Sequence, residues 1–270
     1  MDVNITGIRS ELGRVMARQS GPRGSALAHI NLAGQQANTL LHDGQAWKDF
    51  ARAAQDTTQR ALRAAEAAAA PMFVHASFAF VQALERGAEL ARPRRSAVDA
   101  ILACEALALS GSVPACVVRL GYLYGPDSAD LLAYRGAFRL GRPYWSGSTT
   151  ALQYHLHQFD AGAALLHAAK PRNAGKIFYA TDGTAVAFRQ LMDGFAHRVG
   201  RRSPLHLPTW SKLAAKLIIR EEHMQQVALA MPALAPKPRV PGWKPRFPDY
   251  REGLDQVIDV WRQGPAQHIG

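Results

Sequence analysis

The side chains best suited to proton transfer in this sequence are two tyrosines and two histidines. Tyr122 and Tyr124 follow a short apolar run that ends at Leu120, and His155 and His157 lie in a later apolar stretch. Residues at positions i and i+2 of a β-strand point to one face, so we expect the two histidines side by side. Because a phenol or an imidazole can pass a proton, Tyr122 and His155 are candidate acid/base residues.

Each of these side chains also has a structural interpretation. Tyr124 can pack its own loop, Tyr122 can fill space, and the histidines can be buried beside a helix that starts with Asp160 as its N-cap, a favoured residue there. We place Tyr124 and His157 on the substrate side of a site. The pair of histidines lacks the third protein ligand of a catalytic metal centre, so we expect no metal.

A glycine-containing turn follows the first apolar run. Residues 6–13 read T-G-I-R-S-E-L-G and open a helical pattern. Glycines after a strand let the backbone turn sharply and approach a pyrophosphate on the helix N-terminus. Ser10 replaces the middle glycine, so its Cβ narrows the cleft, although its hydroxyl could donate to a phosphate. Gly7, Ser10 and Gly13 are therefore candidate cofactor contacts, but a plain strand-to-helix connection has the same appearance.

Short apolar runs alternate with helical stretches, which predicts an α/β fold with a parallel sheet. Residues 201–250 carry many prolines and basic side chains and indicate a smaller C-terminal lobe. We expect a nucleotide-binding domain over 1–145 with parts of 150–200, and a small lobe or tail over 201–270. The expected strands are 3–6, 26–32, 72–76, 115–120, 152–157 and 176–180, and the expected helices are 45–70, 97–109, 128–140, a helix from 159, and 188–199.

The composition narrows the class of protein. The net charge is +11 and the pI is about 10.1, but the arginines are dispersed, with no aromatic-studded basic helix, so we do not expect nucleic-acid binding. Cys104 and Cys116 are the two cysteines, which indicates neither a disulfide framework nor a zinc site. No apolar stretch reaches the roughly 20 residues that cross a bilayer, and no secretory signal is apparent. We expect a cytoplasmic protein.

Four segments carry motifs in a fixed order along the chain. They are the turn at 6–13, H-I-N-L-A-G at 29–34, F-V-H-A-S at 73–77, and R-L-G-Y-L-Y-G-P at 119–126. Together they resemble the extended short-chain dehydrogenase/reductases of the NAD-dependent epimerase/dehydratase family. The resemblance implies a Rossmann-like doubly wound parallel sheet that binds NAD or NADP. It adds Ala33, Gly34, Ser77 and Gly121 to the cofactor contacts.

The chain departs from that family between its first two strands. Only a few residues separate the helix that ends near Gln19 from the strand that begins at Ala26, where the family places strands two and three. Two such units need about 50 residues, since one βαβ unit takes about 30. The resemblance assigns the adenine pocket to the missing units, so we expect weak affinity for NAD or NADP. Strand one becomes a sheet edge, and we hypothesise that a second copy or another protein covers Val3 to Thr6.

A second departure concerns the catalytic side chains that the resemblance implies. In the family a lysine one turn after a tyrosine lowers the tyrosine pKa, as a neighbouring cation does, and a serine holds the substrate oxygen. Alignment on Glu105 places Ala97 at the tyrosine position and Ile101 at the lysine position. Phe78 falls at the serine position, with Ser77 beside it. We find no side chain suited to proton transfer at these positions.

These departures define two functional hypotheses. The first is an NAD(P)-binding epimerase/dehydratase-like protein that is catalytically inactive or weakly active and acts as a binding or structural subunit. The alternative is an active NAD(P)-dependent oxidoreductase or epimerase on a nucleotide-sugar-like carbonyl substrate. In that case Tyr122 or His155 would serve as a non-standard acid/base.

Overall fold

A five-stranded parallel sheet forms the centre of the computed structural model, which describes residues 3–19, 28–32, 44–85, 92–141, 144–146, 152–207 and 237–263. Its order is β1-β2-β3-β4-β8, and each neighbouring pair is parallel. The expected α/β class and Rossmann-like parallel sheet are confirmed. The strands are β1 (Val3–Thr6), β2 (Ala28–Asn31), β3 (Phe73–Phe78), β4 (Ala115–Leu120) and β8 (Ile177–Ala180).

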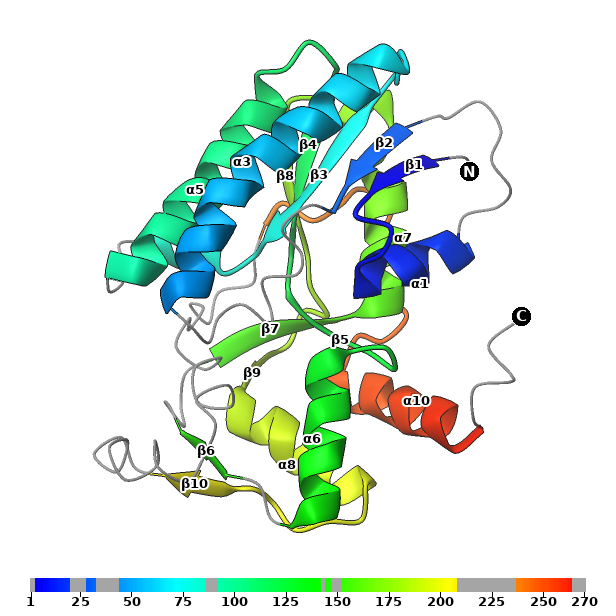
Figure 1. Ribbon diagram of the computed structural model, residues 1–270. Coiled ribbons are helices and arrows are strands. Elements are labelled where there is room, and N and C mark those ends of the chain that lie inside the picture. Colours follow the sequence, from blue (N-terminus) through cyan, green and yellow to red (C-terminus); the bar gives the residue numbers. More distant parts are fainter. Residues whose placement is uncertain are drawn as a thin grey trace.

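Helices cover both faces of this sheet (Figure 1). α3 (Gly44–Ala67) and α5 (Arg92–Leu109) lie side by side on one face, and α1 (Glu11–Gln19) and α7 (Gln158–Ala168) lie on the other. α1 illustrates the sequence basis of this packing. Its buried residues Leu12, Val15 and Met16 follow the i, i+3, i+4 spacing of an apolar helix stripe. The sheet is therefore doubly wound, as expected.

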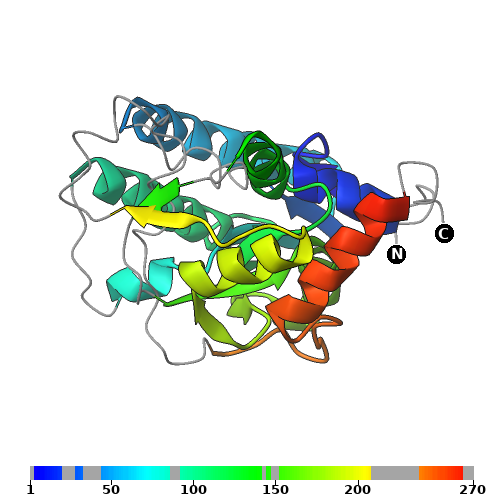
Figure 2. The same ribbon diagram turned by 90° about the horizontal axis from the view of Figure 1, so that it is seen from below.

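Smaller elements pack below the carboxyl ends of the main sheet. α6, α8 and α10 share a second hydrophobic cluster, and α8 and α10 lie at the front when the molecule is seen from below (Figure 2). The elements are β5 (Tyr122–Tyr124), β7 (Leu152–His157) and β9 (Ala185–Ala187) in one sheet, β6 (Tyr144–Ser146) and β10 (Leu205–Leu207) in another, and α4 (Val81–Glu85), α6 (Ala129–Leu140), the 3₁₀ turn η1 (Pro171–Asn173), α8 (Phe188–Arg198) and α10 (Tyr250–Gln263).

The two edges of the main sheet differ. At β8 the C-terminal segment adds a bridge between Tyr179 and Arg239, and the Tyr179 N–H donates to the carbonyl of Pro238 at 2.8 Å. β1 pairs with β2, and among the described residues no strand lies on its outer side. The absence of two strand–helix units and the edge position of β1 are therefore confirmed for the part of the chain that the structure describes.

Most expected elements agree with the structure, and the exceptions have local causes. The strands at 115–120 and 152–157 match β4 and β7 at both ends. α5 begins at Arg92, earlier than the expected 97, with Pro93 in its first turn, where a missing N–H costs no helical bond. Residues 122–124, which follow β4, form the short strand β5, which pairs in parallel with β7.

Candidate functional site

The turn after β1 has the tight shape that its glycines predict. Gly7 has φ +87°, and a Cβ there would lie 3.1 Å from the Leu32 Cβ. At Gly13 a Cβ would overlap the Gly7 carbonyl oxygen, so α1 can approach the turn only with glycine at this position. The structure thus brings Gly7, Ser10 and Gly13 together at the carboxyl end of β1, which is where α/β sheets bind ligands.

Ser10 and Glu11 give this turn features that a phosphate-binding loop lacks. Ser10 is buried, and its Oγ accepts the Gly13 N–H at 3.0 Å, so the side chain caps α1. The Glu11 carboxylate accepts the Ala129 N–H at 3.0 Å and the Gln158 Nε2–H at 3.1 Å. Burial is the main cause of the raised pKa of Glu11. A carboxylate at the first helical position ties α1 to α6 and α7 and opposes a second anion there.

The positions expected for the catalytic tyrosine and lysine lie on α5. Ile101 is 3% exposed and stands one turn before Glu105, and Ala97 stands one turn earlier still. Phe78, at the expected serine position, is a buried residue at the end of β3. A buried isoleucine and a phenylalanine can neither donate a proton nor lower a phenol pKa. The family's proton-transfer chemistry therefore has no side chain to carry it at these positions.

Ser77 belongs to a buried network of charges that the sequence analysis missed. Arg119 is 2% exposed and binds both oxygens of Glu105, at 2.9 Å from Nε and 2.6 Å from Nη2. It also binds Glu85, at 2.7 and 2.9 Å, and donates to the Tyr179 hydroxyl at 2.6 Å. The Ser77 hydroxyl donates to Glu105 at 2.5 Å. An arginine inside the apolar strand A-C-V-V-R-L was the available signal, since a buried guanidinium needs anionic partners.

The geometry disfavours Tyr122 and His155 as acid/base residues. The Tyr122 hydroxyl donates to Asp130 Oδ2 at 2.7 Å, and burial followed by the charge of Asp130 raises its pKa well above 10. His155 is 0% exposed, and burial lowers its pKa to about 3. Neither of its ring nitrogens has a hydrogen-bond partner among the described residues. The imidazole is therefore neutral and closed off from a reacting group.

Tyr124 and His157 are held by internal contacts. Tyr124 packs against α10, where a Cβ at Gly253 would overlap its hydroxyl. His157 Nδ1 accepts the Phe159 N–H at 3.2 Å, and its Nε2 lies 3.0 Å from Gln256 Oε1. The histidine is thus the N-cap of α7, and the expected cap at Asp160 was wrong.

Asp160 lies inside the first turn of α7 and holds the C-terminal segment in place. Its two oxygens accept the backbone N–H groups of Arg246 and Phe247 at 2.7 and 2.9 Å. Because these donors arrive from a distant segment, local sequence could not reveal the arrangement.

The remaining cofactor positions are partly accounted for. Ala33 and Gly34 lie outside the described residues. Gly121 follows β4, and a Cβ there would lie 2.8 Å from the Tyr154 carbonyl oxygen, so close packing against β7 requires this glycine.

Among the described residues, no group of His, Cys, Asp or Glu could hold a metal ion, and no helix is long and apolar enough to cross a membrane.

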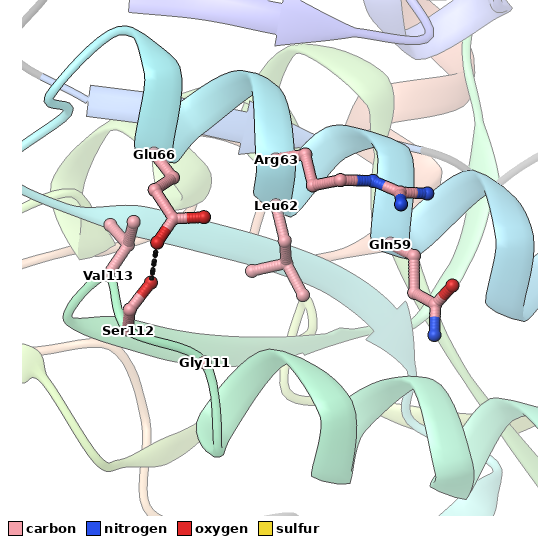
Figure 3. Close-up of a pocket in the computed structure, with 7 residues that line it drawn as sticks. All are labelled: Gln59, Leu62, Arg63, Glu66, Gly111, Ser112 and Val113. Atoms are coloured by element: carbon pink, nitrogen blue, oxygen red, sulfur yellow. Dashed lines mark hydrogen bonds between the residues drawn. The ribbon is translucent and has the colours of Figure 1, made fainter.

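A surface pocket of about 260 Å³ lies at the opposite end of the sheet (Figure 3). It lies between α3 and the turn that precedes β4, and the Ser112 hydroxyl donates to Glu66 at 2.7 Å across it. Ligands of α/β sheets bind at the carboxyl ends of the strands, so this pocket is unrelated to the candidate site. It is lined by Gln59, Leu62, Arg63, Glu66, Gly111, Ser112 and Val113.

Known proteins of similar structure cover almost the whole chain. The human epimerase family protein SDR39U1 (isoform 2), solved with NADPH, matches with a TM-score of 0.69 at 18% identity over 96% of this chain and 99% of that one. MoeE5 in complex with UDP-glucuronic acid and NAD matches with a TM-score of 0.71 at 20% identity over 97% and 99%. The chain shares the fold of these two proteins.

Sequence comparison adds one similar protein, a reductase. A 3-diazoavenalumate denitrifying reductase from Streptomyces sp. is 27% identical over 268 residues, which cover 90% of this chain and 86% of that protein. No family model matches the sequence. The expected resemblance is therefore confirmed as a likeness of fold, with a reductase among the similar sequences.

The two structural neighbours were solved with NADPH or NAD, and the residues present here fit only part of such a cofactor. The turn keeps Gly7 for its tight bend and Gly13 for the close packing of α1, whereas Ser10 stands where a glycine would let the backbone approach a pyrophosphate. On the outer side of β1, where the adenosine half would lie, the described residues supply no strand. Among the described residues, the site therefore keeps the shape of the turn and lacks the strand that would hold the adenosine part.

Restoring the middle glycine should strengthen cofactor binding. In Ser10→Gly the Cβ that narrows the cleft is gone, and we expect affinity for NADH to rise about tenfold, since tenfold corresponds to 1.4 kcal/mol and one misplaced carbon is worth about 1–3 kcal/mol. Glycine is tolerated at an N-cap, so α1 should lose only a few tenths of a kcal/mol. Calorimetric titration checks the affinity, and Ser10→Ala is the matched control. Weaker binding in the glycine variant would mean that the hydroxyl contacts the phosphate.

Asp182 gives the structure an alkaline sensitivity. It is buried after β8, one carboxylate oxygen has no described partner, and burial raises its pKa to about 8. In the folded chain Asp182 then keeps its proton up to about pH 8, whereas in the unfolded chain it loses the proton above about pH 4. The free energy of unfolding therefore falls as the pH rises towards 8. Asp182→Asn should shrink the stability difference between pH 6.8 and pH 8.8 in urea denaturation. An unchanged difference would contradict this assignment.

Proposed function

We propose that the chain binds a nicotinamide cofactor weakly and is inactive, or nearly so, on carbonyl substrates, acting as a binding or structural subunit. The fold and the glycine turn support cofactor binding, as do the neighbours of this fold, which were solved with NAD or NADPH. The buried Ile101 at the lysine position carries the second half of the proposal. Without acid/base help, a typical factor of about 10² to 10⁴ in rate is lost.

Calorimetric titration with NADH and NADPH, beside a thermal-shift scan, tests the binding half. Saturable binding should stabilise the fold by about 2.7 kcal/mol at a hundredfold excess over Kd. A carbonyl panel that includes a nucleotide-sugar substrate tests the catalytic half, and we expect no turnover above background. Steady turnover that Tyr122→Phe abolishes would reject inactivity and support the alternative of a true oxidoreductase or epimerase.

A second candidate function is hydride reduction of an acceptor that needs no proton from the protein. The relative named as a denitrifying reductase of a diazo compound favours it. Hydride transfer to a carbonyl creates an alkoxide that must be protonated. An arenediazonium ion is already cationic, so hydride transfer to it gives a neutral product that needs no proton. Hydride from a reduced nicotinamide cofactor adds to its terminal nitrogen, the diazene loses N₂, and that hydrogen ends on the ring carbon. Charge and atoms balance without the missing tyrosine and lysine.

Nitrogen release tests this second function directly. The protein would be incubated with NADPH and a water-soluble arenediazonium salt, with N₂ followed by mass spectrometry and NADPH by absorbance. We expect N₂ and cofactor oxidation in a one-to-one ratio, faster than with heat-denatured protein. Equal rates with native and denatured protein would exclude the reaction for that substrate.

We further propose that a second copy of the chain or another protein covers the outer edge of β1. Val3 and Ile5 are half-buried against the main core, and an unpaired strand edge invites pairing. Backbone amides of Val3 to Thr6 should then exchange slowly, and more slowly as protein concentration rises if the partner is a second copy. A monodisperse monomer whose β1 amides exchange rapidly at every concentration would contradict self-association.

A further inference from the structure

The C-terminal segment connects the two large hydrophobic clusters of the molecule. Residues 237–249, which we call the strap, run from the edge of β8 to the start of α10 and are drawn in orange in Figure 1. Val240 and Trp243 of the strap are buried in the cluster of the main sheet. α10 then packs in the second cluster, together with α6 and α8, through Tyr250, Leu254, Val257 and Ile258.

The sequence of the strap limits its backbone hydrogen bonds. It contains prolines at 238, 241, 245 and 248, which have no N–H group to donate and cannot pair as the interior of a strand. At the edge of β8 the Tyr179 N–H donates to the Pro238 carbonyl at 2.8 Å, and inside the strap the Trp243 N–H donates to the Val240 carbonyl at 3.3 Å. The strap must therefore be held by a small number of strong contacts.

One buried carboxylate supplies two of these contacts. Asp160 is 1% exposed, and its two oxygens accept the consecutive N–H groups of Arg246 and Phe247 at 2.7 and 2.9 Å. Hydrogen bonds to a charged acceptor are roughly twice as strong as those between neutral groups, and the first turn of α7 favours a negative charge. The Phe247 ring also lies beside His157, with ring centroids 4.5 Å apart. Asp160 is thus the principal polar anchor of the strap among the described residues.

The contacts of α10 itself leave it dependent on that anchor. Asp255 pairs with Arg198 of α8 at 2.6 Å, but its side chain is 61% exposed, and exposed ion pairs contribute little to stability. The Trp261 Nε1–H donates to the Pro126 carbonyl at 2.9 Å at the far end of the helix. These contacts, like the buried residues of α10, join the helix to the second cluster and not to the main sheet.

We propose that residues 237–263 open as one cooperative unit while the main sheet stays folded, with the Asp160 carboxylate as the latch. Segments held by few backbone hydrogen bonds open before the core of a protein does. Release of the latch frees the strap from β8 and lifts α10 from α8, which uncovers apolar side chains of the second cluster such as Leu191 and Phe195. The strap is then a device that sets how firmly the small lobe is closed, and it does not depend on cofactor binding.

Native-state hydrogen exchange on the full chain tests whether the unit opens separately. In the native sequence, the amides of Leu254, Val257 and Ile258 should exchange at one common level and faster than those of β4. Ile30→Val weakens the main core far from the strap and should accelerate the β4 amides by about two- to tenfold. The α10 amides should keep their rates in this variant, because the main sheet stays folded when the strap opens.

Asp160→Asn tests the latch. Its amide group keeps one acceptor oxygen and turns a donor towards the second N–H, so we expect the α10 amides to exchange about tenfold faster, which corresponds to 1.4 kcal/mol. The β4 amides should accelerate as well, since global unfolding also breaks the latch. Asp255→Asn is the matched control on α10, because it removes an exposed carboxylate, and it should change the α10 rates by less than about threefold.

Three results would overturn the inference. The first is α10 amides as slow as those of β4 in the native sequence, and the second is equal acceleration of both sets by Ile30→Val. In either case the strap opens only when the whole chain unfolds. The third is an Asp160→Asn variant with unchanged α10 rates, which would remove Asp160 as the latch. If that variant does not fold, Phe247→Ala replaces it, since it loosens the strap beside an intact carboxylate and should also accelerate the α10 amides.

Discussion

Replacing Arg119 with alanine should lower the free energy of unfolding by about 3–5 kcal/mol, the loss found when one partner of a buried ion pair is removed. The guanidinium is buried between Glu105, Glu85 and the Tyr179 hydroxyl. Glu105 is 3% exposed in the native chain, so in the variant its carboxylate would be left buried without its cation. Urea denaturation at neutral pH measures the loss.

Two further variants make this prediction specific to the buried pair. Arg95 and Asp99 form an exposed pair at 3.1 Å on α5, and Asp99→Asn should change stability by less than about 1 kcal/mol. Replacing both partners, as in Arg119→Met with Glu105→Leu, should recover part of the loss, because no unpaired charge is then buried. If Arg119→Ala cost no more than the exposed variant, the network would contribute nothing to stability.

Lowering the pH from 7 to 5.5 should destabilise the protein. Burial lowers the pKa of His75, His155 and His157 to about 4, 3 and 4. Below about 6.5 the unfolded chain binds protons that the folded chain excludes, so stability falls with pH. The carboxyl groups of Asp182, Glu11 and Asp160 oppose this loss. Their pKa values are raised in the folded chain, so the folded chain binds protons that the unfolded chain does not. Urea denaturation at the two pH values measures the net loss.

His155→Phe isolates one of these histidines. Neither ring nitrogen has a described partner, and Tyr122, Tyr124 and Tyr250 surround the ring. Leaving a buried polar group unsatisfied costs about 1–3 kcal/mol, so phenylalanine should stabilise the fold at pH 7 and reduce the loss at pH 5.5. His155→Asn is the contrast, since it keeps a polar group and loses volume. A destabilised phenylalanine variant with unchanged acid sensitivity would show that the imidazole is hydrated or bonded in solution.

The residues that stabilise the fold differ from those at the positions expected for proton transfer. The sheet, the glycine turn and the Arg119 network maintain a Rossmann-like scaffold. The positions that would move a proton hold Ala97, Ile101 and Phe78. Such a scaffold can still orient a cofactor, and positioning alone lowers a barrier when the acceptor is reactive enough. Substrates that require a proton donor are therefore the ones that the chain should not turn over.

The sequence by itself determined the features that depend on neighbouring residues and on residue counts. Apolar runs placed β4 and β7 at their observed ends, and glycines at 7 and 13 marked the turn after β1. The short link between Gln19 and Ala26 excluded two strand–helix units. The replacement of the catalytic pair at 97 and 101 needed only an alignment on Glu105. Hydrophobic periodicity and backbone conformation depend on a few neighbouring residues, and the length of a link is counted directly from the sequence. These features can therefore be predicted without knowing the tertiary structure.

Only the tertiary structure decided which polar groups meet. Glu11 binds the Ala129 N–H and the Gln158 side chain, both more than a hundred residues away. Asp160, expected as a helix cap, accepts N–H groups from the C-terminal segment, and His157 takes over the cap. His155, a candidate base by residue type, is buried without a partner. Hydrogen bonding and burial depend on which elements pack together, and that packing is set by the whole chain.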